Sequence, residues 1–160
     1  MQKYAIGFCL LLVTSCGASA IDPESFDPAV LTEPVACESA FNLFNPDSTV
    51  SLGVGLVGED GLVFEIEEGQ AVGSITFGED LGIRLCADLP GPGSTVDESW
   101  PLVSGRIELD EPIPTDSLGG GGGVPVSASA TGLVAETPSG ELVDVGDLQL
   151  VNDRWGFQGG

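Results

Sequence analysis

Residues 133–151 read LVAETPSGELVDVGDLQLV, the clearest structural signal in the chain. Thr137-Pro138-Ser139-Gly140 places proline and glycine where a type I turn prefers them, between two runs of alternating apolar and polar residues. Beyond the turn, the apolar positions change parity across Gly146-Asp147, which predicts a β-bulge. The stretch therefore predicts a bulged antiparallel β-hairpin.

The same alternation recurs upstream. Runs at residues 50–56 and 62–66 flank the tight-turn sequence Gly58-Glu59-Asp60-Gly61, so we expect a second β-hairpin there. Four further runs predict strands, and their apolar residues are Ile75 and Phe77; Ile83, Leu85 and Ala87; Val103, Ile107 and Leu109; and Val124, Val126, Ala128 and Ala130. After the first 20 residues, no apolar pattern holds helical spacing for three turns, and glycine interrupts each candidate helix.

These patterns predict an all-β fold: a small antiparallel β-sandwich or barrel of about seven to eight short strands with one disulfide. It differs from an immunoglobulin domain, whose tryptophan lies between its two cysteines, because Trp100 follows both Cys37 and Cys86. Segments 90–101 and 110–123 are rich in proline and glycine and are expected to be long loops. Such loops on a rigid scaffold often carry binding function.

The first residues, MQKYAIGFCLLLVTSCGASA, have the features of an export signal. Lys3 precedes an apolar run from Ala5 to Val13, and small residues follow. This run is too short to span a bilayer, which needs roughly 20 residues. The segment is therefore excluded from fold reasoning.

Leu12-Val13-Thr14-Ser15-Cys16 resembles the lipobox of bacterial lipoproteins. The resemblance covers about the first 16 residues and implies a signal peptide of residues 1–15, with Cys16 lipid-modified as the new N-terminus. Gly17 is not the aspartate that retains some lipoproteins in the inner membrane, so a Gram-negative host would send the protein to its outer membrane. The alternative is ordinary cleavage after Ala18-Ser19-Ala20, giving a periplasmic or secreted protein.

The remaining chain divides by composition into a leader, a domain and a tail. Residues 16–36 are rich in proline and acid and are expected to be an extended linker between the lipid and the domain. Residues 37–155 are expected to form the β-sandwich, and 156–160 a glycine-rich tail. Aromatic residues at this end, Trp155 and Phe157, are expected to cap the core, with a docking peptide as the alternative.

Cys37 and Cys86 are the two cysteines left once Cys9 leaves with the signal and Cys16 is lipidated. An even pair in an exported chain predicts a structural disulfide, worth roughly 4 kcal/mol for a loop of about 50 residues. The alternation around Cys86 places it with Arg84 and Asp88 on the polar side of its strand. A redox-active pair would need a shorter spacing.

The charge and the lack of histidine exclude several functions. The 160 residues hold 25 acidic side chains, four basic ones and no histidine, for a net charge of −21. Such a charge repels nucleic acid, and Ser-His-Asp, Cys-His and tetrahedral zinc sites lack their ligands. Carboxylate doublets such as Glu67-Glu68 and Asp110-Glu111 leave a carboxylate-based hydrolase as the enzymatic alternative.

Calcium binds oxygen ligands and is the one metal that the composition leaves open. Asp144, Asp147 and Asp153 lie close together in the sequence near the expected bulge, and 45–49 form a second oxygen-rich turn. Neither matches an EF-hand or a calcium-binding repeat. They are candidate ligands only, and we expect no metal or other cofactor.

The sequence thus predicts a non-enzymatic, lipid-anchored cell-envelope protein. Its partners would be the membrane, through the lipid, and an unidentified envelope protein that meets the acidic β-sandwich. The alternative is an exported calcium- or carbohydrate-binding module.

Overall fold

The computed structural model describes residues 21–36, 39–58, 61–82, 93–114 and 123–156. They form an all-β fold, as predicted, with two short 3-10 turns, η1 (Pro23–Ser25) and η2 (Pro28–Val30). The strands of the described residues are β1 (Glu33–Pro34), β2 (Ala40–Phe44), β3 (Val50–Leu56), β4 (Val63–Glu65), β5 (Ala71–Glu79), β6 (Thr95–Leu109), β7 (Val124–Glu136) and β8 (Leu142–Trp155).

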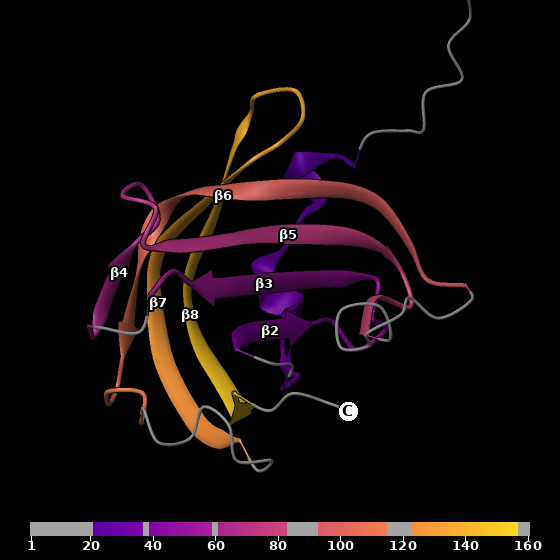
Figure 1. Ribbon diagram of the computed structural model, residues 1–160. Helices are drawn as coiled ribbons and strands as arrows, with labels where there is room; N and C mark the ends of the chain where they lie inside the picture. The colour runs from indigo at the N-terminus through magenta and orange to yellow at the C-terminus, as the bar shows by residue number, and fades with distance from the viewer. Residues whose placement is uncertain (1–20, 37–38, 59–60, 83–92, 115–122, 157–160) are drawn as a thin grey trace, which may run out of the picture.

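The strands make one antiparallel sheet that curls nearly into a barrel. Its order is β1-β2-β3-β5-β6-β7-β8, with β4 paired to β6. Figure 1 shows β2, β3 and β5 running side by side and β7 and β8 crossing their direction. The two ends of the sheet meet where the buried Asn152 on β8 donates its Nδ2 to the carbonyl oxygen of Ala40 on β2, at 2.7 Å.

β6 belongs to both halves of the sheet, whose strands run in different directions. Its first half pairs with β5 and its second half with β7. The register shifts twice between Leu102 and Arg106, around Gly105, whose φ is +131°. The buried side chains change parity there, from Trp100 and Leu102 to Ile107 and Leu109. Two irregularities around one glycine therefore allow a single 15-residue strand to serve both halves.

The hairpin predicted at residues 133–151 is confirmed as the pair β7 and β8. Its turn is closed by Gly140, which donates its backbone N–H to the carbonyl oxygen of Thr137 at 2.9 Å. Register shifts flank the pair Leu133 and Gly146, as the change of apolar parity predicts. Asp147 stabilises this irregularity, because its Oδ1 accepts the N–H of Gly132 at 2.9 Å.

The hairpin predicted between residues 50–56 and 62–66 is wrong. β3 pairs with β5 along its whole length, and Val57 donates its N–H to the carbonyl oxygen of Gln70 at 2.8 Å. The described residues between Val57 and Gln70 thus belong to an excursion from a β3–β5 hairpin, and β4 among them pairs with β6. The reason is the length of the possible pairing: seven residues of β5, from Ala71 to Phe77, pair with all of β3, whereas β4 has only three residues.

The strands are also longer than expected. β6, β7 and β8 hold 15, 13 and 14 residues, so they are not short. β6 begins at Thr95, so most of the loop expected at residues 90–101 is strand, and Trp100 lies in the core. The strand predicted around Arg84, Cys86 and Asp88 lies outside the described residues. The same holds for Cys37 and for residues 115–122 of the second expected loop. The disulfide stays a prediction.

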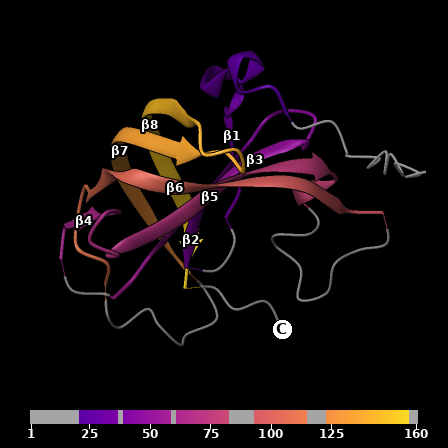
Figure 2. The same ribbon diagram turned by 90° about the horizontal axis from the view of Figure 1, so that it is seen from above.

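Residues 21–36, which we call the N-terminal strap, belong to the fold instead of forming a solvated linker. Asp22 and Asp27 cap η1 and η2, each followed by a proline. Leu31 is 5% exposed and packs in the core, and Glu33 on β1 pairs with Phe44 on β2. Figure 2 shows the strap on the side of the β3–β5–β6 layer toward which β7 and β8 curl. The described fold therefore includes residues well before Cys37, as far back as Ile21.

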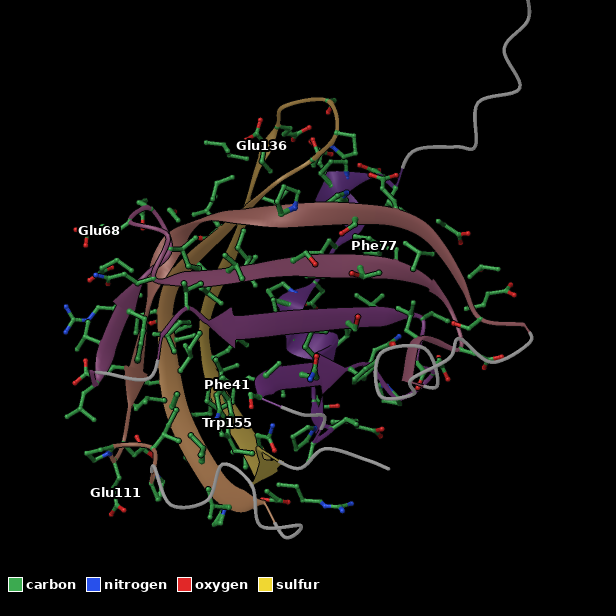
Figure 3. The ribbon with its side chains drawn as sticks, viewed as in Figure 1. Phe41, Glu68, Phe77, Glu111, Glu136 and Trp155 are labelled. Atoms are coloured by element: carbon green, nitrogen blue, oxygen red, sulfur yellow. The ribbon has the colours of Figure 1, made fainter. Side chains whose placement is uncertain are left out.

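The core lies on the concave side of the sheet. Phe77 and Trp100 pack with ring centroids 4.5 Å apart, and Phe41 and Trp155 with centroids 4.9 Å apart. Figure 3 shows Phe41 and Trp155 together near the end of β8. Trp155 is 3% exposed, so the prediction that it caps the core is confirmed, while Phe157 lies outside the described residues.

Candidate functional site

The three aspartates proposed as calcium ligands lie along β8 without converging. A strand rises about 3.3 Å per residue, so Asp144 and Asp153 are roughly 30 Å apart along it. Asp147 is already bonded to the Gly132 N–H. In the described part of the chain, no group of three or more acidic, histidine or cysteine side chains could hold a metal ion. Closeness in sequence was misleading because an extended strand spreads its side chains out.

Millimolar calcium is therefore expected to leave the melting temperature where an equal concentration of magnesium leaves it. A specific site saturated at 100 times its Kd would add about 2.7 kcal/mol to stability, which differential scanning calorimetry detects easily. A rise seen with calcium alone, and lost in Asp144→Asn, would contradict this expectation. Magnesium is the control for screening of the acidic surface.

The second oxygen-rich turn, at residues 45–49, uses its oxygens internally. Asn45 Oδ1 accepts the backbone N–H groups of Thr49 and Val50, each at 2.9 Å. Asn45 Nδ2 donates to Thr49 Oγ1, also at 2.9 Å. These bonds close the turn between β2 and β3, so the polar residues there have a structural role.

The carboxylate doublets are spread over the molecule. Figure 3 shows Glu68 and Glu111, which belong to two different doublets, at separate corners of the molecule. Glu67 has a structural role, because its Oε2 accepts the N–H of Gly105 at 3.2 Å. A glycosidase needs two carboxyl groups facing each other across a cleft, and these positions do not provide that arrangement.

One doublet does line a pocket. Asp110 and Glu111 lie on a pocket of about 300 Å³, whose remaining walls are Pro112, Pro114, Pro125, Val126 and Ser127. Asp110 donates its N–H to the carbonyl oxygen of Ser127 at 3.0 Å, which joins the two walls. Both acids come from one wall, and the wall from β7 contributes no acid to face them. The described walls of the pocket can offer negative charge to a ligand, but among them no second carboxylate faces Asp110 and Glu111 as an opposed acid or base.

Glu98, the second acid of the doublet Asp97-Glu98, was expected from the sequence to be solvated like the other doublets, but both of its carboxylate oxygens accept hydrogen bonds. Glu98 on β6 is half-buried and accepts the indole Nε1–H of Trp100 at 2.6 Å through its Oε1. Its Oε2 accepts the backbone N–H of Ile21 at 3.1 Å. Glu98 alternates in step with Trp100 and Leu102, so it points to the core side, and this parity is the sequence signal that could have found it.

The exposed acids meet little opposite charge. Arg106 lies 3.6 Å from Glu65 and 3.2 Å from Glu108, and all three side chains are at least one-third exposed. Exposed pairs of this kind contribute at most about 1 kcal/mol. The whole chain has four basic side chains against 25 acidic ones. The surface therefore has a strongly negative field.

No helix in the described residues is long and apolar enough to cross a membrane. Comparison with protein-family models, with curated proteins and with solved structures found no match, so the residues of this chain alone carry the functional argument.

Proposed function

We propose that the protein is a non-enzymatic lipoprotein of the cell envelope. Its Cys16 carries the lipid, and its folded part presents an acidic β surface to a partner. The observation that carries the proposal is a lipobox-like sequence ending at Cys16, five positions before Ile21, the first residue that the structure describes and one that packs against the core. Lipidation of Cys16 would therefore leave the side chains of the described core in place.

The surface offered to a partner is the outer face of the long strands. Acidic residues occupy exposed positions on β6 and β8, namely Asp97, Glu108, Asp144, Asp147 and Asp153. Such a field accelerates the approach of a basic partner and weakens with salt. The partner class that fits is a basic envelope protein, and the chain needs no catalytic group for this role.

The intact mass of the protein from native membranes tests the anchor. We expect a chain that starts at Cys16 and carries acyl groups, and Cys16→Ala should release it from the membrane fraction. Cys9→Ala is the matched control, because Cys9 lies in the segment that is removed, and its product should have the wild-type mass. Reduction should add the mass of two hydrogen atoms if Cys37 and Cys86 are bridged.

A different mass would overturn the proposal. A chain that starts at Ile21 without lipid would show cleavage after Ala20 and make the protein soluble in the periplasm or medium. Retention of the Cys16→Ala protein in washed membranes would also count against the anchor.

A further inference from the structure

The N-terminal strap is fastened to the sheet at its first residue. Glu98 accepts the N–H of Ile21 with one oxygen and the indole N–H of Trp100 with the other, at 3.1 and 2.6 Å. Trp100 is fully buried, so it fixes the carboxylate from the core side. A single carboxylate therefore joins the start of the strap to the centre of the fold.

Packing holds the strap along the rest of its length. Phe26 meets the rings of Phe77 and Trp100 edge-on, with centroids 6.0 and 5.7 Å apart. Leu31 is buried, and β1 extends the sheet beside β2. The proline after each capping aspartate fixes its own φ, which lowers the entropy that ordering the strap costs. The strap is thus part of the folded unit.

This fastening leaves little chain between the lipid and the fold. Five Cα steps separate Cys16 from Ile21, and each spans at most about 3.5 Å, giving a reach of roughly 17 Å. A free linker to Val35 would have reached on the order of 65 Å. The strap removes most of this length.

We propose that the end of the barrel that carries Ile21, Glu98 and Trp100 lies against the lipid surface. This inference rests on the proposed lipidation of Cys16. In Figure 1 the strap begins above β6, and β8 ends on the opposite side of the molecule. The zwitterionic headgroups of the leaflet are the neighbour at the Ile21 end, and the end where β8 finishes points away from them.

The fluorescence of Trp100 can report the distance between this end of the barrel and the lipid, because Trp100 and Ile21 are hydrogen-bonded to the same carboxylate, that of Glu98. In a Trp155→Phe background, Trp100 is the only tryptophan of the chain. The lipidated protein is reconstituted into phosphatidylcholine vesicles with a dansyl-labelled headgroup lipid. We expect strong energy transfer from Trp100 to dansyl.

Two variants test whether the short tether causes the transfer. A Gly-Ser spacer of about 12 residues between Ala20 and Ile21 roughly doubles the mean reach of the tether, from about 12 Å to about 23 Å, and should remove most of the transfer. The pair Glu98→Gln with Phe26→Ala loosens the strap and should lower the transfer in the same direction. Glu24→Gln, which changes an exposed acid on the strap itself, is the matched control and should leave transfer unchanged.

Vesicle flotation separates the two proposals. If the protein floats with vesicles but Trp100 transfers no better without the spacer than with it, the membrane-facing end is wrong and lipidation stands. If the protein does not float, the lipid anchor and this inference both fail. The spacer changes no described residue, so a folding defect in the other variant does not decide the test.

Discussion

Gly105→Ala is expected to lower the free energy of unfolding by about 3 kcal/mol, through backbone strain and overpacking. The φ of Gly105 is +131°, a conformation that side chains rarely adopt. A Cβ atom there would lie 2.7 Å from Leu133 Cδ2 and 3.0 Å from Leu133 Cα. Since the backbone of β7 cannot move away freely, β6 would have to straighten where it passes from β5 to β7.

Gly132→Ala is the matched control for this prediction. Gly132 also has a positive φ, +60°, but nothing lies within 4 Å of the position of its Cβ. Strain alone should cost about 1 kcal/mol there. Urea unfolding followed by tryptophan fluorescence measures both variants. Equal losses would show that the contact with Leu133 contributes nothing, and that the bend of β6 is not fixed at Gly105.

The local parts of the fold could be predicted from the sequence, whereas the distant pairings could not. The β7–β8 turn and its bulge follow from Thr137–Gly140 and Gly146, because both strands of that hairpin are neighbours in the sequence. The partner of β3 depends on β5, which lies beyond an excursion that itself resembles a hairpin. Short-range turn signals cannot decide between two partners of different length.

The strap was misread for a similar reason. Asp22-Pro23 and Asp27-Pro28 are typical of solvated linkers, and the same pairs also cap short 3-10 turns. What places the strap on the sheet is the contact of Phe26 with Trp100, which is 74 positions away in the printed sequence. Composition carries no information about such a contact.

Some candidate functional residues could be found from the sequence, and others only from the structure. Cys16 stands in a short motif whose meaning is local, so the sequence alone supports it. The aspartates of β8 were grouped by position in the sequence, and the strand separates them. Glu98 became visible as a site only when Ile21 and Trp100 were placed on either side of it. The strap is therefore what connects the fold to the proposed anchor.

Asn152→Ala is expected to cost about 3 kcal/mol, because it removes two hydrogen bonds from a buried position. Asn152 is 1% exposed, and its Nδ2 lies 2.7 Å from the Ala40 carbonyl oxygen. Its Oδ1 accepts the N–H of Arg154 at 2.8 Å. The first bond joins β8 to β2, so its loss should loosen the closure of the barrel and the nearby packing of Trp155 on Phe41.

Asn42→Ala separates this role from that of a buried asparagine in general. Asn42 is also buried and donates to the same Ala40 oxygen, but at 3.5 Å and from the neighbouring part of its own strand. Its loss should cost about 1 kcal/mol or less. Thermal unfolding with near-ultraviolet circular dichroism follows stability and the Trp155 environment together. If the two variants lose equal stability and Asn152→Ala keeps the native aromatic signal, the closure is held by side-chain packing, and Asn152 only fills space between β8 and β2.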